Sequence, residues 1–151
     1  MSEHKADVKW ERRTNDFNYD SYNRGHSIIF NDEISIQGSA AAEFKGDPHC
    51  ANPEQVLTAA LSSCHLLTFL AIAAKKRYTV EEYHDEAIGF LEKGEEGRLV
   101  VSRAVLQPRA KFSGGKIPSK EELEKLHDSA HKHCAIANSV TTKVEIKIRY
   151  F

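Results

Sequence analysis

The sequence predicts an α+β fold with the element order βββ-α-ββ-α-β and largely antiparallel pairing. Three observations support this prediction: a long apolar run that opens with helix-start residues at Asn52, a second helical pattern that opens at Ser119, and alternating polar and apolar residues elsewhere. The chain has 151 residues, of which 40% are hydrophobic and 28% charged. This length and composition are typical of one globular domain, which we expect to span residues 1–151.

The N-terminal third has the pattern of a three-stranded antiparallel meander. Strands are expected at 5–13, 26–30 and 33–37, because branched and alternating residues recur there between polar turns. The turn between the second and third strands is Asn31-Asp32. A long loop, 38–51, follows, and loops of this length in compact domains are often functional.

The first helix has a well-marked beginning. Asn52 is expected to cap it, Pro53 suits its first position, and Glu54 favours the positive end of the helix dipole. Apolar residues then occupy almost every face as far as Ala74, so most of the helix surface has to be covered. One sheet covers only one face, and we therefore expect a second copy of the chain to cover another, with this helix near the interface of a homodimer.

Charge and hydropathy exclude several classes of function. The net charge of −1 does not indicate binding to nucleic acid or to an acidic membrane. The apolar run has nearly the length of a membrane span, but it contains too many polar residues, so we expect a buried core helix. No apolar signal segment opens the chain, which predicts a cytoplasmic protein in which structural disulfides are rare.

The second half of the chain contains two extended segments, a helix and a last strand. The extended segments, 78–91 and 99–112, are joined by a polar hairpin turn that contains glycine. Ser119 and Glu122 form a capping-box pattern at the start of the second helix, which is expected to end at Cys134. Alternation over 141–150 predicts the final strand.

Two cysteines are candidates for chemistry. Cys64 lies too far from the start of its helix for the dipole to activate it, so a reactive thiolate would need a neighbouring cation such as an arginine or His65. Cys134 ends the second helix, and two thiols on two helices can pack closely enough for disulfide exchange. The alternative for each cysteine is an inert core residue. A third cysteine, Cys50, lies in the loop before the first helix, and the sequence assigns it no role.

Metal binding is a competing interpretation. His127, His131 and Cys134 can share one face of the second helix, and imidazole and thiolate ligands suit zinc. A tetrahedral site would need a fourth ligand, for which the candidates are His49, Cys50 and Cys64. The serines lack the Gly-x-Ser-x-Gly setting of hydrolases, and the chain has no glycine-rich phosphate loop.

The residues around Cys64 resemble the OsmC/Ohr family of osmotically induced and organic hydroperoxide resistance proteins. The resemblance rests on Asn52-Pro53-Glu54-Gln55, on Ala59-Ala60-Leu61-Ser62-Ser63-Cys64-His65, and on a second cysteine near the end of the second helix. The element order is similar across nearly the whole chain. The segment 135–139 before the final strand fits an OsmC-like branch better than the core Ohr group.

The resemblance implies a thiol-dependent peroxidase for organic hydroperoxides or hydrogen peroxide, without a metal or organic cofactor, that serves in oxidative-stress defence. Cys64 matches the peroxidatic cysteine, which becomes a sulfenic acid, and Cys134 matches the resolving cysteine, which forms a disulfide with it. An external dithiol would then reduce the pair. Glu54 matches the family's glutamate, and Arg24 stands at the place of the arginine that pairs with it and stabilises the thiolate, with Arg12 and Arg13 as the alternatives.

The spacing of the implied site residues adds a constraint. Glu54 and Cys64 lie ten residues apart, which is roughly 15 Å along a straight helix. The pair of Glu54 and Arg24 would then approach the cysteines from the loop region or from a second subunit, which predicts two composite sites in an intertwined homodimer. A family member that has lost the chemistry and binds a small apolar ligand in the same pocket is the remaining alternative.

Overall fold

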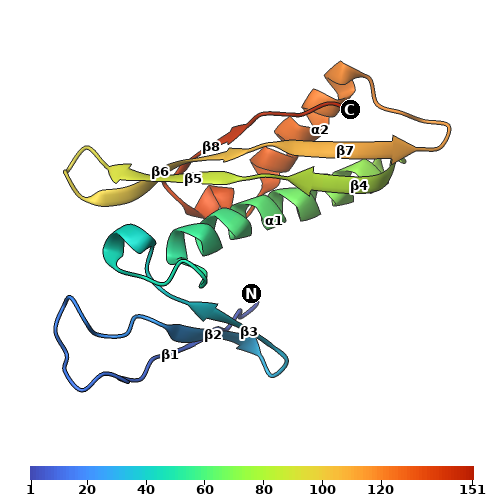
Figure 1. The fold of residues 1–151 in the computed structure, drawn as a ribbon. Coiled ribbons are helices and arrows are strands. Elements are labelled where there is room, and N and C mark those ends of the chain that lie inside the picture. Colours follow the sequence, from blue (N-terminus) through green and yellow to red (C-terminus); the bar gives the residue numbers. More distant parts are fainter. The chain divides into compact units, whose positions relative to one another are not determined.

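The computed structural model describes residues 1–151, and the chain divides into two compact units (Figure 1). The first unit is Met1–Val56 and the second is Leu57–Phe151. The expectation of a single domain over residues 1–151 stays a prediction.

The N-terminal unit contains the expected antiparallel meander. Its strands are β1 (Asp7–Lys9), β2 (His26–Asn31) and β3 (Ile34–Gly38), in the sheet order β1-β2-β3. The side chain of Asn31 holds the turn between β2 and β3 by accepting the backbone N–H groups of the two residues after Asp32, at 3.0 Å each. β1 is much shorter than the expected 5–13. Beyond Lys9 the chain bonds to Asn23 instead of pairing with β2: the indole of Trp10 donates to the Asn23 carbonyl at 2.6 Å, and the N–H of Arg13 donates to the Asn23 side chain at 2.8 Å.

The long loop before the first helix is folded back on itself. It contains a short 3-10 helix, Ala42–Phe44, and the N–H of Ser39 donates to the carbonyl of Ala51 at 2.9 Å. Gly46 is required here, because a Cβ at this position would lie 1.6 Å from the carbonyl oxygen of Ala40. The loop therefore has a fixed conformation that leads directly into α1.

The first helix, α1, is Pro53–Lys75 and begins as predicted. The N–H of Gln55 donates to the side chain of Asn52 at 2.8 Å, and the N–H of Asn52 donates back to the side chain of Gln55 at 3.0 Å. The buried positions recur every three or four residues and form one stripe: Thr58, Leu61, His65, Phe69 and Ala73. α1 is long and apolar enough to cross a membrane by length and composition, and 28% of its most apolar window is buried within the chain.

Two small sheets form the β structure of the C-terminal unit. One pairs β4 (Thr79–Asp85) with β7 (Pro108–Ser113), and the other has the order β5 (Ile88–Lys93), β6 (Leu99–Leu106), β8 (Lys143–Ile146). Each of the two expected extended segments is therefore divided into two strands that belong to different sheets, β4 with β5 and β6 with β7.

Side-chain hydrogen bonds explain where the extended segments divide. Asp85 accepts the backbone N–H of Gln107 at 2.6 Å, and the side-chain amide of Gln107 donates to the carbonyl of Glu86 at 2.8 Å. These bonds replace the regular ladder at the points where β4 ends and β7 begins. The break lets both segments change from one sheet to the other.

The final strand differs from the expectation in its length and in the direction of its pairing. β8 is shorter than the predicted 141–150 and pairs with β6 in parallel, whereas the other strand pairs are antiparallel. The chain continues this pairing beyond β8, because the N–H of Lys147 donates to Leu106 and that of Arg149 donates to Pro108, each at 2.8 Å. The two later bonds extend the last segment along both β6 and β7.

The second helix, α2, is Lys120–His133, and its predicted capping box between Ser119 and Glu122 is present. The core of this unit lies between α1, α2 and the sheet of β4 and β7. Its buried members are Phe69, Ala73, Tyr78, Ala110, Leu123, Leu126 and Ala130. This packing fixes how the two helices approach each other in the part of the unit that carries the cysteines.

Candidate active site

The packing of α1 against the end of α2 brings two cysteines together. Cys64, in the middle of α1, is within hydrogen-bonding contact of Cys134, which caps the C-terminus of α2. Both thiols are free. Cys134 is 1% exposed, whereas Cys64 is only partly buried. The two sulfurs thus form a reduced pair in which Cys64 is the more accessible member.

The segment after α2 wraps around the sulfur of Cys134. The helix ends because Cys134 takes an extended conformation, with ψ of 109°. The N–H of Ala137 then donates to the Cys134 sulfur at 3.4 Å, and the N–H of Asn138 donates to the Cys134 carbonyl at 3.0 Å. A short 3-10 turn, Ala137–Ser139, completes this wrap before the chain enters β8.

The pKa values of the two thiols are shifted in opposite directions. Burial raises the pKa of the Cys64 thiol, but hydrogen bonds from the backbone of Ile136, from the Cys134 thiol and from the backbone of Ala135 outweigh it, so that the pKa is lowered overall. Burial is also the largest influence on Cys134, and there it prevails and raises the pKa, although the N–H of Ala137 opposes it. The arrangement favours a thiolate on Cys64 and a thiol on Cys134.

His65 does not supply the expected positive charge. Its Nε2 lies 3.0 Å from Nδ1 of His127, and both imidazoles are 1% exposed. Burial lowers the pKa of His65 to about 4, with a further contribution from His131, and burial lowers the pKa of His127 to about 3. Both rings are therefore neutral at physiological pH. Of the two candidate cations, an arginine or His65, the structure therefore does not support His65, because its ring is stacked on His127 and buried away from water.

The histidine and cysteine set proposed as metal ligands is not assembled. The ring of His127 is stacked on Phe69, with centroids 4.4 Å apart, and its Nδ1 is hydrogen-bonded to His65. Cys134 is turned toward Cys64. Nowhere along residues 1–151 do three or more His, Cys, Asp or Glu side chains gather as a group that could hold a metal ion.

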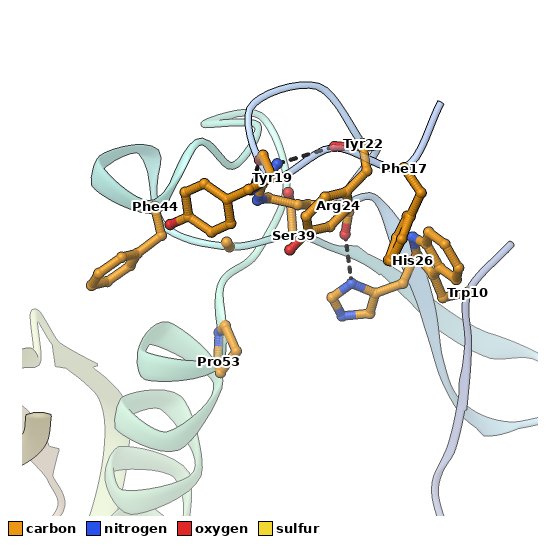
Figure 2. A pocket seen from close by; sticks show the side chains of 10 residues that line it. Trp10, Phe17, Tyr19, Tyr22, Arg24, His26, Ser39, Phe44 and Pro53 are labelled. Carbon is orange, nitrogen blue, oxygen red and sulfur yellow. Dashed lines mark hydrogen bonds between the residues drawn. The ribbon is translucent and has the colours of Figure 1, made fainter. Parts of the chain in front are cut away.

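Arg24 and Glu54 are positioned by the N-terminal unit. The guanidinium of Arg24 donates to the carbonyls of Tyr22 at 3.0 Å and Tyr19 at 2.6 Å, and it lies over the Tyr22 ring, 3.9 Å from the centroid (Figure 2). Glu54 is in the first turn of α1. Arg24 belongs to a different unit from Cys64, so its contact with the thiolate stays a prediction. The loop cysteine, Cys50, is free and partly buried.

Several functional features have no signal in the sequence. The backbone donors of 135–137 belong to residue types that carry no polar side chain, and only their position just after Cys134 marks them. The pairing of His65 with His127 links residues 62 positions apart. Asp85 accepts the hydroxyl of Ser62 at 2.5 Å and ties α1 to β4, a contact between residues 23 positions apart that no local pattern marks.

The fold and the paired thiols define a class of small α+β protein in which two helices carry a cysteine each. A family model described as "OsmC-like protein" matches residues 46–149. The chain belongs to the OsmC-like family, as the residues around Cys64 indicated.

Comparison with solved structures agrees with this assignment. An OsmC-like protein of unknown function from Vibrio cholerae is 43% identical over 99% of this chain and 100% of its own, with a TM-score of 0.94. An organic hydroperoxide resistance protein from Elizabethkingia anophelis shares the fold at 17% identity, covering 99% of this chain and 96% of its own, with a TM-score of 0.71. For OhrB of Bacillus subtilis, also an organic hydroperoxide resistance protein, the identity is 19%, the coverages 97% and 98%, and the TM-score 0.64. No curated protein matches the sequence.

Proposed function

We propose that this protein is a thiol-dependent peroxidase that reduces organic hydroperoxides or hydrogen peroxide in oxidative-stress defence. The observation that carries the proposal is the contact between Cys64 and Cys134, with the pKa of Cys64 lowered and that of Cys134 raised. These opposite directions suit a nucleophile and a resolving thiol. Free thiols of this kind need a reducing compartment, which favours the cytoplasm.

The proposed reaction balances with the two cysteines and one external reductant. The Cys64 thiolate attacks one peroxide oxygen, the O–O bond breaks, and the departing alkoxide or hydroxide takes up a proton. Cys64 is then a sulfenic acid. The sulfur of Cys134 attacks the sulfur of Cys64, and the sulfenic hydroxyl leaves as water with the proton of Cys134. An external dithiol returns two electrons and two protons to the disulfide.

Contact between the sulfurs gives the resolving step a specific advantage. Cys134 is already within hydrogen-bonding reach of Cys64, so disulfide formation needs no unfolding of either helix. A sulfenic acid that is resolved quickly is protected from further, irreversible oxidation. Because Cys134 is 1% exposed, peroxide meets Cys64 first.

The resemblance assigns Glu54 and Arg24 to the same site, and the exposed face of α1 supports a homodimer that would assemble it. Leu67, in the middle of this apolar helix, is 64% exposed, and Ala59, Ser63 and Ala71 are exposed on the same side. A second subunit would bury this stripe. Each large apolar side chain that it covers would stabilise the dimer by about 2 kcal/mol. We propose that the charged pair completes the thiolate site in this dimer.

The test is peroxide consumption with a dithiol reductant. Cys64→Ser is expected to abolish turnover, and Cys134→Ser is expected to allow about one turnover before the protein is inactivated, because the sulfenic acid is no longer resolved. Cys50→Ser is the matched control and is expected to keep full activity. Mass spectrometry after one equivalent of peroxide should find the Cys64–Cys134 disulfide. Turnover by Cys64→Ser, or no peroxide consumption by the fully reduced protein, would refute the proposal.

A further inference from the structure

The hydroxyl of Thr68 lies beside the proposed nucleophile. Thr68 follows Cys64 by one turn of α1, and residues four apart share one face of a helix. Its hydroxyl donates to the Cys64 carbonyl at 2.8 Å. Because helical side chains lean back over the preceding turn, the same hydroxyl is also within hydrogen-bonding contact of the Cys64 thiol. One hydroxyl thus lies between the carbonyl and the sulfur of the same residue.

The Cys64 carbonyl does not depend on this hydroxyl. α1 runs without interruption from Pro53 to Lys75, and in an α-helix each carbonyl accepts the backbone N–H four residues later. The Cys64 carbonyl therefore already has the N–H of Thr68 as a donor. A threonine hydroxyl can rotate its single proton to suit its acceptor. When the proton of Thr68 turns away from this carbonyl, no buried group is left without a partner.

The charge of the sulfur decides where the Thr68 proton points. A neutral Cys64 thiol is a weak donor, so its S–H can point at the Thr68 oxygen while the hydroxyl donates to the carbonyl. A thiolate only accepts. A hydrogen bond to an ionised acceptor is stronger than one to a neutral carbonyl, so ionisation of Cys64 favours rotation of the hydroxyl toward the sulfur.

The neighbouring serines of α1 are not placed for this task. Ser62 donates its hydroxyl to the carboxylate of Asp85 at 2.5 Å. Ser63 is exposed, and adjacent residues of a helix do not face each other. Thr68 is therefore the hydroxyl in this part of the helix that can serve Cys64.

We propose that Thr68 is a further catalytic residue, whose hydroxyl turns from the Cys64 carbonyl to the Cys64 sulfur and donates to the thiolate. It approaches the sulfur from α1, whereas the backbone donors of 135–136 belong to the segment after α2. Attack on peroxide makes the sulfur neutral, so the hydroxyl then returns to the carbonyl and leaves the sulfur open to Cys134. This inference rests on the proposed peroxidase for the peroxide step, but the ionisation of Cys64 is testable without peroxide.

The first experiment measures the ionisation of Cys64 alone. In a Cys50→Ser, Cys134→Ser background Cys64 is the one thiol left in the chain, and its reaction with 4,4′-dithiodipyridine is followed from pH 5 to 10. Thr68→Val replaces the hydroxyl by a methyl group and is expected to raise the pKa of Cys64 by about 1 unit, because the thiolate loses a charge-assisted hydrogen bond. Thr68→Ser keeps a hydroxyl and is expected to restore the profile of the background protein.

The shape of the pH profile separates this role from damage to the fold. Below the pKa of Cys64, a rise of 1 unit makes the thiolate about 10-fold scarcer, while the higher pKa makes it about 3-fold more nucleophilic. Thr68→Val is therefore expected to react about 3-fold more slowly than the background protein at low pH and about 3-fold faster at a pH above both pKa values. Should Thr68→Val not fold, Thr68→Ala takes its place with the same expectation. Thr79→Val is the control, because it removes a hydroxyl at the exposed start of β4, and its profile is expected to be unchanged.

The second experiment adds the substrate. Reduced full-length protein with its three cysteines is mixed with tert-butyl hydroperoxide, and Thr68→Val is expected to consume it about 3-fold more slowly than the wild type below the pKa of Cys64, with Thr68→Ser restoring the rate. Coincident thiol profiles of Thr68→Val and the background protein, or an equal loss of rate at every pH, would overturn the inference. A shifted thiol profile in a protein that consumes no peroxide would count against the proposed function and not against Thr68 as the donor.

Discussion

The buried pair of His65 and His127 predicts a strong dependence of stability on pH. Lowering the pH from 7 to 5 is expected to reduce the free energy of unfolding by about 4 kcal/mol through these two residues. The sign follows from their pKa values, which are about 4 and about 3 in the folded chain against an ordinary value of 6.5. Between these limits the unfolded chain binds more protons than the folded chain, so stability falls as the pH falls below 6.5.

The magnitude follows from the same values. At pH 5 both histidines of the unfolded chain are protonated, whereas both remain neutral in the fold. The difference of 1.5 pH units from 6.5 corresponds to about 2 kcal/mol for each residue. The pair also lowers the stability of the fold, because Nδ1 of His65 and Nε2 of His127 are buried without a hydrogen-bond partner.

The double variant His65→Leu with His127→Phe tests this reasoning. It removes both titrating groups, and Phe keeps the stacking of position 127 on Phe69, whose ring centroid lies 4.4 Å away. Replacing both partners of a buried hydrogen bond by apolar groups is nearly neutral or stabilising, so stability at pH 7 is expected to hold or rise. Stability between pH 7 and 5 is then expected to fall by about 4 kcal/mol less than in the wild type.

Urea unfolding followed by circular dichroism at pH 7, 6 and 5 measures the difference, at one fixed protein concentration so that any dimerisation contributes equally. His84→Asn is the control, because His84 is exposed on β4. Its pH dependence is expected to equal that of the wild type. A double variant that loses as much stability on acidification as the wild type would show that the two imidazoles are not buried in neutral form.

The remaining predictions concern the helix start, the thiols and the proposed interface. Asn52→Ala removes the cap of α1 and is expected to lower the free energy of unfolding by about 1 kcal/mol in urea titrations. Iodoacetamide is expected to alkylate Cys64 faster than Cys134 at neutral pH, as peptide mapping would show; equal rates would contradict the pKa directions. Arg24→Gln is expected to raise the pKa of Cys64 by about 1 unit or more if the guanidinium reaches the thiolate, and an unchanged alkylation profile would exclude that role. Leu67→Asp is expected to convert a dimer to a monomer in light scattering, and a wild-type protein that is already monomeric would refute the proposed assembly.

Local signals predicted the helices well. The start of α1 at Pro53 and the capping box at Ser119 depend on side chains and backbone groups within one turn, so the sequence contains all the information needed. The division of the extended segments was not predicted, because Asp85 and Gln107 come together only in the folded unit. The parallel pairing of β8 with β6 was not predicted for the same reason, because it depends on where the chain lies in the folded unit after α2 ends.

In the candidate site, too, local features could be predicted from the sequence and contacts between remote residues could not. Cys64 and Cys134 were both identified from residue type and helix position, and the structure brings them together. The charge state of His65 was not predictable, because it depends on burial against His127, which is remote in the chain. Sequence reasoning favoured a cation beside Cys64 because charged side chains are visible in a sequence and backbone dipoles are not.

The backbone donors near Cys64 have a further consequence for how the site responds to substitution. The N–H groups of Ala135 and Ile136 lower the pKa of Cys64, and that of Ala137 contacts Cys134. A backbone N–H survives any side-chain replacement except proline. The stabilisation of the thiolate therefore depends on the path of 135–137 after α2, and this path is fixed in turn by hydrogen bonds to the Cys134 carbonyl and from Ser139 to the carbonyl of Ala135 at 2.7 Å. Through these bonds the carbonyl of Cys134 helps to hold the backbone donors that lower the pKa of Cys64, so substitutions that move this segment are expected to change both thiols together.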